Sequence, residues 1–76
     1  MNSLVVKSPL ASKIWFTTDK LNLLLEDGRE IAVPLEWFPS LLKASDSQRK
    51  NWRLIGDGEG INWPDLDEDI LVEGLL

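Results

Sequence analysis

The run Trp52-Arg-Leu-Ile-Gly-Asp-Gly-Glu-Gly-Ile-Asn-Trp-Pro-Asp-Leu-Asp-Glu-Asp69 holds the clearest structural signals in the chain. Two short runs, Trp52–Ile55 and Gly60–Trp63, flank a glycine-rich acidic turn, which is typical of a β-hairpin. Their apolar residues alternate with polar ones, so four apolar side chains can cover one face. Pro64 has no N–H to donate, so strand pairing should stop there. The bend after it should lead into a last strand or a short helical turn over 69–72.

A second hairpin is expected upstream, where Leu21–Leu25 and Arg29–Val33 flank Glu26-Asp27-Gly28. A two-residue Asp-Gly turn would put the apolar residues of the two strands on opposite faces. A three-residue loop with Gly28 in a left-handed conformation puts them all on one face. Because a one-residue slip turns every side chain over, burial should select the three-residue loop. Leu24 is then left on an outer face that we expect to be partly covered. The expected pairs are Leu25 with Arg29, Leu23 with Ile31 and Leu21 with Val33.

The segments around this hairpin predict one more strand and a short helix. Lys13–Thr18 is β-branched and aromatic and should form a strand. Residues 1–12 are expected to form a short strand or an arm that orders against a neighbour. After Pro34, we expect a single turn over 35–38 and a short helix over 39–43, because proline is tolerated in a first turn. The side chains expected to face inward are Phe38, Leu41 and Leu42.

A second short helix should begin after Ser45, the expected N-cap, and end near Asn51. Gln48 stands at the position of a capping box. The predicted fold class is therefore α+β. We expect a small single domain over residues 1–76, with two antiparallel β-hairpins plus an N-terminal strand, and one or two short helices between the hairpins.

Composition excludes several classes of function. The 76 residues include no Cys and no His, which removes disulfides, thiolate zinc sites and the usual general base. Thirteen acidic residues against eight basic ones give a net charge of -5, which opposes binding to a phosphate backbone. The apolar runs are far shorter than the ~20 residues that span a bilayer, and no signal peptide is visible. We therefore expect a cytoplasmic protein that is not an enzyme, needs no cofactor and contacts neither membrane nor nucleic acid.

Several motifs together resemble those of a known family of small bacterial domains of unknown function. They are Asp27-Gly28-Arg29, Pro34-Leu35, Trp37-Phe38-Pro39, Trp52-Arg-Leu-Ile-Gly56 and Gly60-Ile-Asn-Trp-Pro-Asp-Leu-Asp-Glu-Asp-Ile70. The family signature is a DGR hairpin, P-L-x-W-[FY]-P and G-x-G-I-H-W-P-x-L-D-E-D-I. One departure is Asn62, which stands where the family usually has His. The resemblance implies a small α+β fold and no catalytic residues. It also implies that such proteins are often encoded beside a second small protein, in pairs that look like toxin–antitoxin systems.

Two glycine- or acid-rich stretches are candidate ligand sites, and both favour a structural interpretation. The acids of 65–69 have the alternate spacing of a calcium loop, but Ile70 and Leu76 occupy the positions that need Gly and a bidentate Glu. We expect a bend whose carboxylates cap backbone N–H groups. The loop Gly56–Gly60 joins two strands and carries carboxylates, unlike a phosphate loop. Structural roles are thus assigned to Gly28, Gly60, Trp63, Pro64, Asp67 and Asp69.

The four tryptophans are the most informative functional candidates. Most should pack in the core, and we expect Trp15 or Trp37 to remain exposed and anchor a protein interface. Free sheet edges offer a second docking route, by strand addition.

The function predicted first is a non-catalytic protein-interaction module. It would act as a homo-oligomer or as the antitoxin-like or regulatory half of a two-protein pair. The alternative is a ligand- or metal-binding domain that uses the acidic C-terminal bend. The cluster Lys43, Arg49, Lys50 and Arg53 could favour nucleic acid, but is more typical of a solvated helix face.

Overall fold

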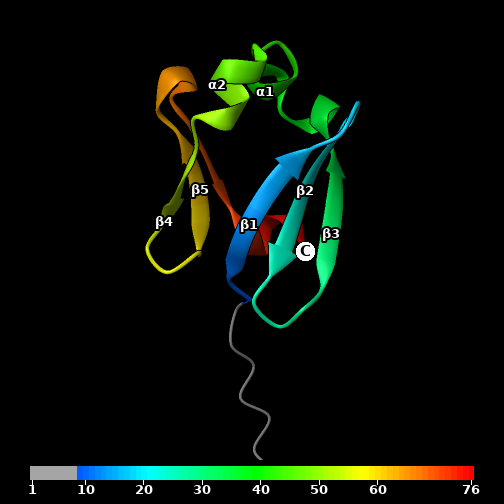
Figure 1. Ribbon diagram of the computed structural model, residues 1–76, viewed down its shortest axis with the longest axis vertical. Helices are drawn as coiled ribbons and strands as arrows, with labels where there is room; N and C mark the ends of the chain where they lie inside the picture. Colours follow the sequence, from blue (N-terminus) through cyan, green and yellow to red (C-terminus); the bar gives the residue numbers. More distant parts are fainter. Residues whose placement is uncertain (1–8) are drawn as a thin grey trace, which may run out of the picture.

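The first half of the chain forms an antiparallel sheet in the order β1-β2-β3 (Figure 1). The computed structural model describes residues 9–76. Its first three strands are β1 (Ala11–Phe16), β2 (Lys20–Leu25) and β3 (Glu30–Pro34). β1 begins two residues earlier than predicted, because Ala11 already pairs with Leu25. It also ends two residues earlier, because the Thr17 N–H donates to the Lys20 carbonyl at 3.0 Å in the turn. Of the expected N-terminal strand or arm, residues 1–8 lie outside the described residues.

The hairpin between β2 and β3 has the register that burial predicts. Leu21 pairs with Val33 and Leu23 with Ile31, and the Leu25 N–H donates to the Arg29 carbonyl at 2.8 Å. Gly28 has φ 95°, the left-handed conformation that a three-residue loop requires. The three odd-numbered leucines of β2 are buried, while Leu24 is half-buried on the outer face, as expected.

Short helices connect the two sheets. A 3₁₀ turn, η1 (Leu35–Trp37), leads into α1 (Pro39–Leu42) and then α2 (Asp46–Lys50). The capping box is present: the Ser45 hydroxyl accepts from the Gln48 N–H, and the Gln48 side chain accepts from the Ser45 N–H. The prediction that Leu42 faces inward is wrong, since its side chain is 47% exposed. Adjacent residues of a helix differ by about 100° in direction, so the single turn of α1 buries Leu41 and leaves Leu42 outside.

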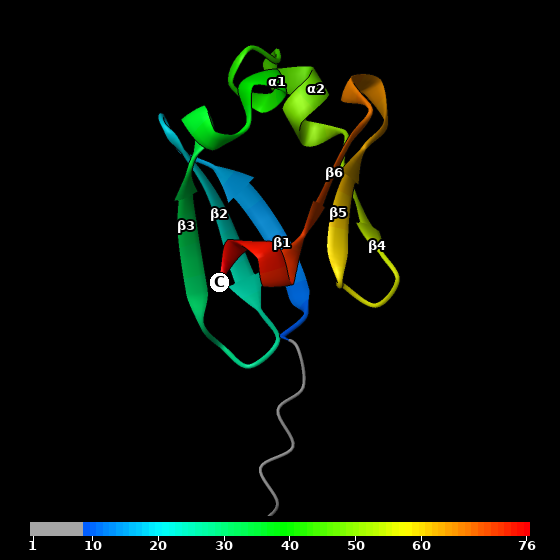
Figure 2. The same ribbon diagram turned by 180° about the vertical axis from the view of Figure 1, so that it is seen from behind.

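The second half of the chain forms another antiparallel sheet, in the order β4-β5-β6. It consists of β4 (Arg53–Ile55), β5 (Gly60–Trp63) and β6 (Glu68–Leu71), with the 3₁₀ turns η2 (Pro64–Leu66) and η3 (Val72–Leu75) after β5 and β6. Leu54 pairs with Ile61, so the predicted second hairpin is confirmed. Of the two alternatives for the segment after the bend, the strand is the one formed, and η3 then lies near β1 and β2 (Figure 2).

Side chains from both sheets share one apolar core. Buried residues of β1, β2 and β3 belong to the same cluster as Ile61, Trp63 and Ile70 of the second sheet. Phe16 and Trp63 meet edge to face across the two sheets, with ring centroids 6.3 Å apart. The Trp63 indole N–H donates to the Arg49 carbonyl at 3.1 Å, which ties β5 to α2. The result is a small α+β domain in which two three-stranded sheets are joined by short helices.

Candidate functional site

The two tryptophans predicted to form an interface lie at different places. Trp15 lines a groove beside β1, whereas Trp37 lines a shallower depression on β6 and η3. Trp37 is 59% exposed, in agreement with the prediction, and Trp15 is half-buried. The structure therefore does not bring them together, and they belong to two separate surfaces.

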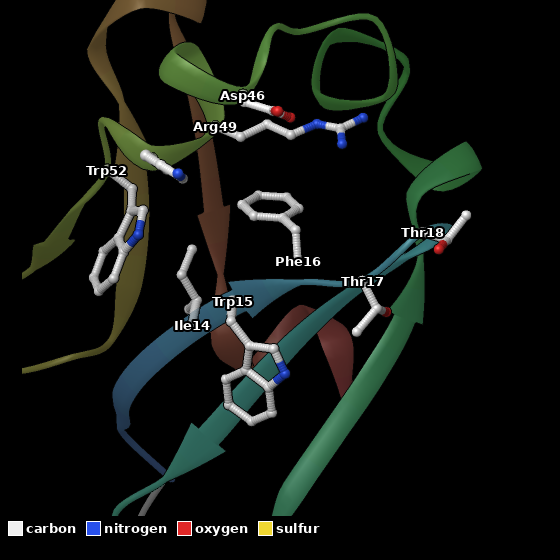
Figure 3. Close-up of a pocket in the computed structure, with 9 residues that line it drawn as sticks. Ile14, Trp15, Phe16, Thr17, Thr18, Asp46, Arg49 and Trp52 are labelled. Carbon is white, nitrogen blue, oxygen red and sulfur yellow. The ribbon is translucent and has the colours of Figure 1, made fainter.

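The first surface is a groove of about 660 Å³ between β1 and α2, which we call the β1 groove. Figure 3 shows Arg49 and Asp46 on one side of the strand residues and Trp52 beside them. Its walls combine aromatic rings, threonine hydroxyls and charges of both signs. The lining residues are Ile14, Trp15, Phe16, Thr17, Thr18, Asp46, Arg49, Lys50 and Trp52.

Arg49 is held in the β1 groove by contacts with its neighbours. Its Nε donates to the Leu41 carbonyl at 2.9 Å and its Nη2 to the Leu42 carbonyl at 3.0 Å. The guanidinium carbon also lies 5.5 Å from the centre of the Phe16 ring, a cation–π distance. These contacts use two of the five guanidinium N–H donors, so a fixed positive charge with spare donors lies at the groove.

The second surface is apolar and we call it the Trp37 surface: Trp37, Phe38, Ile70, Leu71 and Leu75, with Asp69 and Gly74. Leu71 is 55% exposed and shares the depression with Trp37. Trp37 is the last residue of η1, whose backbone is anchored by buried Leu35: the Leu35 N–H donates to the Asp19 carbonyl at 2.9 Å. The indole is thus presented from a fixed backbone.

The acidic bend is braced by side chains. Asp65 accepts from the Asn51 amide at 3.0 Å, Asp69 from the Asn62 amide, and Glu68 from the Ser40 hydroxyl. The expected capping of backbone N–H groups is therefore not what these three carboxylates do, because amide and hydroxyl donors of neighbouring elements reach them. Within residues 9–76, no group of three or more carboxylates is arranged to hold a metal ion.

The residues assigned structural roles in this region each have a local contact or conformation that explains them. Asp67 is left-handed at φ 51° and ends η2, which Pro64 opens at its first position. Trp63 is completely buried. Gly60 lies so close to β6 that a Cβ would stand 2.9 Å from the Ile70 carbonyl oxygen.

Asn62 lies at the centre of a row of polar side chains across the second sheet. The Arg53 Nε donates to the Asn62 Oδ1 at 3.0 Å, and the Asn62 amide donates to Asp69 on the other side. A neutral imidazole also has one acceptor and one donor nitrogen. The histidine that the resemblance leads one to expect at this position could therefore make the same two bonds.

Sequence reasoning missed the contribution of α2 and Trp52 to the β1 groove. The sequence predicts Arg49 and Lys50 on a solvated helix face and Trp52 on the apolar face of a hairpin. The groove depends on how α2 lies against β1, which is at least 30 positions away in the sequence. The only local sign was an aromatic residue just after a helix with two basic residues in its last turn.

No helix of the described part of the chain is long and apolar enough to cross a membrane. No curated protein matches the sequence. A crystal structure of a protein of unknown function from Rhodospirillum rubrum is similar: the sequences are 31% identical, the TM-score is 0.77, and the match covers 91% of this chain and 86% of that one. The family described as protein of unknown function (DUF2442) matches residues 11–76. Since this match includes both sheets and the helices between them, the chain belongs to the DUF2442 family.

Proposed function

We propose that this protein is a non-catalytic protein-interaction module, acting as a homo-oligomer or as the antitoxin-like or regulatory half of a two-protein pair. The observation that carries the proposal is the Trp37 surface. Trp37 and Leu71 leave 59% and 55% of their surface exposed within one depression. Large exposed apolar side chains that lie together mark interaction sites on folded proteins.

The geometry of Trp37 suits an interface anchor. Tryptophan is enriched among the residues that contribute most to binding, because its ring buries a large area while losing little conformational freedom. The backbone of η1 is already fixed by Leu35 and by the Phe38 N–H, which donates to the Leu35 carbonyl at 2.8 Å. A partner would therefore order little besides the indole itself, which keeps the entropic cost of association low.

The test compares the wild-type chain with the double variant Trp37→Ser/Leu71→Ser. Both positions are exposed, so the fold should survive, and Glu36→Ser is the matched control because Glu36 is an exposed neighbour in η1. Light scattering after size exclusion measures self-association. Co-expression with the product of the neighbouring gene, followed by affinity capture, measures pairing with a second protein.

We expect the wild type and Glu36→Ser to form the same assembly, either a dimer or a stable pair with the co-expressed protein, and the double variant to lose it. A wild-type protein that is strictly monomeric and captures no co-expressed protein would contradict the proposal. An assembly that the double variant retains would contradict the role of the Trp37 surface.

A further inference from the structure

β1 has one edge that no other strand of residues 9–76 covers. It pairs with β2 and is the outer strand of its sheet. In an antiparallel pair, residues that exchange hydrogen bonds alternate with residues whose N–H and C=O point away from the partner. The Thr17 N–H donates to Lys20 of β2, and Trp15 pairs with Asn22 two residues earlier. The backbone groups of Ile14 and Phe16 therefore point away from β2.

The β1 groove runs along this free edge. Five consecutive residues, Ile14 to Thr18, line it. The first three, Ile14, Trp15 and Phe16, belong to β1, and Thr17 and Thr18 lie in the turn after it. Successive side chains of a strand point to opposite faces, so a groove that touches all three strand residues follows the edge of β1 and is not confined to one face. Its lower end is closed, because the Ala11 N–H donates to the Gly58 carbonyl at 2.8 Å. The open part of the edge thus extends from Ile14 to Phe16, the last residue of β1.

The charge of the groove differs from that of the whole chain. Arg49 and Lys50 outnumber Asp46 in the lining, although the chain has a net charge of -5. Neither cation forms an ion pair with a carboxylate of residues 9–76. Lys13, the residue before the open edge, lies over the Trp15 ring at 5.4 Å. Such a site favours carboxylates and disfavours a basic segment.

We propose that the β1 groove binds an extended acidic segment of a partner protein, which adds to β1 as a fourth strand of the first sheet. This inference rests on the proposed function, because it specifies the chemistry of a partner for the same module. Main-chain bonds to Ile14 and Phe16 supply affinity, as in other cases of strand addition. Apolar side chains of the added strand lie against Phe16 and Trp52, and its carboxylates lie near Lys50 and the spare donors of Arg49.

The other edge of the sheet fits such a segment less well. β3 begins at Glu30 and ends at Pro34, so it offers a carboxylate at one end and lacks an N–H at the other. None of the residues that line the β1 groove belongs to β3, so the Arg49 and Lys50 charges of the groove do not line that edge. An acidic strand would therefore meet repulsion at β3 and attraction at β1.

The probe is an acetylated, fluorescein-labelled peptide that alternates Val and Glu, and binding to the full chain is measured by fluorescence anisotropy. One control peptide replaces each Glu by Lys. A second carries an N-methyl group on every backbone nitrogen, which removes the donors of both edges. Lys50→Glu tests the groove, and Lys43→Glu is its matched control, because Lys43 is exposed, lies outside the groove and changes the net charge equally.

The proposal expects the Glu peptide to bind and both control peptides to fail. Reversing one partly exposed charge should weaken binding by about fivefold in Lys50→Glu, and Lys43→Glu should bind like the wild type. Amide exchange followed by NMR should show the Ile14 and Phe16 amides becoming protected by the peptide. The Trp15 amide serves as an internal control, since β2 already protects it.

Equal binding of the N-methylated peptide, protection of β3 amides in place of Ile14 and Phe16, or no binding of the Glu peptide would each overturn the proposal. The assembly test of the proposed function uses Trp37→Ser/Leu71→Ser, whose two positions lie on the Trp37 surface and outside the β1 groove. If that loss is seen while the Glu peptide does not bind, the strand-addition inference fails and the proposed function stands.

Discussion

Among the five glycines, Gly58 leaves the least room for a side chain. Its φ is 111°, and an ideal Cβ would lie 2.3 Å from the Ala11 carbonyl oxygen. Because that oxygen belongs to the backbone, it cannot move aside as a flexible side chain could. Gly28 has a similar φ of 95° but open space around it, and Gly74 has open space and no left-handed φ. The three glycines therefore separate the effect of backbone conformation from that of contact.

Alanine substitution should destabilise the chain least at Gly74, more at Gly28 and most at Gly58. We expect a change in unfolding free energy within about 0.5 kcal/mol for Gly74→Ala, about 1 kcal/mol for Gly28→Ala, and about 3 kcal/mol or more for Gly58→Ala. A chain of this size has a total stability of only about 4–11 kcal/mol. Urea unfolding followed by circular dichroism measures all three, and equal losses for Gly28→Ala and Gly58→Ala would contradict the contact with Ala11.

Asp27 gives the first hairpin a dependence on pH. Its carboxylate accepts from the Arg29 N–H at 3.0 Å and from the Arg29 Nε at 2.8 Å. The backbone hydrogen bond, followed by the Arg29 side chain, holds the pKa of Asp27 below its ordinary value. A carboxyl whose folded pKa is depressed stabilises the fold above its unfolded pKa, and this stability is lost as the pH falls through the folded pKa.

Asp27→Asn should therefore cost stability at neutral pH and cost progressively less as the pH falls below about 4. Arg29→Ala should reduce this pH dependence without abolishing it, because the backbone N–H of residue 29 remains. Urea unfolding of the wild type and both variants over a series of pH values measures the effect. A difference between wild type and Asp27→Asn that does not change with pH would disagree with the expectation.

At the scale of elements, α2 depends on its capping box. The helix has only five residues, too few to be stable by itself. Ser45→Ala removes the acceptor for the Gln48 N–H and should lower the free energy of unfolding by about 1 kcal/mol. Ser47→Ala is the control, since its hydroxyl contacts the Ser45 hydroxyl and accepts no backbone N–H among the hydrogen bonds of residues 9–76. Equal effects of the two substitutions in thermal or urea unfolding would show that the cap contributes nothing.

An element can be predicted from the sequence when the residues that determine it are close together in the chain. The register of β2 and β3 is set by apolar alternation and by Gly28, both within one short segment, so sequence alone selects it. Sequence alone does not select the inward-facing residue of α1. A single helical turn can direct either Leu41 or Leu42 toward the core, and the position of the sheets decides which one is buried. The β1 groove is harder still to predict from sequence, because α2 lies against β1 only in the folded chain. Basic residues on a short helix are also common on solvated faces.

At the scale of the whole molecule, η3 attaches the end of the chain to the core. The Val72 N–H donates to the Glu59 carbonyl at 2.9 Å and Val72 is completely buried. Leu75 packs against the same core, while Leu76 is 60% exposed. Deleting Leu75 and Leu76 should lower the unfolding free energy by about 1–2 kcal/mol, which is less than the contribution of a fully buried leucine side chain because Leu75 is only partly buried. Deletion of Leu76 alone should change it by less than about 0.5 kcal/mol, and similar losses from both deletions in urea unfolding would contradict this packing.

The two sheets should unfold together, because neither can bury its apolar face without the other. Trp63 of β5 meets Phe16 of β1 and donates to Arg49 of α2, so the second sheet has its largest buried side chain in contact with the first. The segment from β4 to η3 is also much shorter than the about 40 residues below which a chain rarely folds without disulfides, metals or oligomerisation. Urea transitions followed by tryptophan fluorescence and by far-ultraviolet circular dichroism should therefore coincide, with a slope of about 1 kcal/mol per molar. Amide exchange should give β2 and β5 the same limiting free energy, and a second sheet that opens at clearly lower free energy would show that the two sheets do not form one cooperative unit.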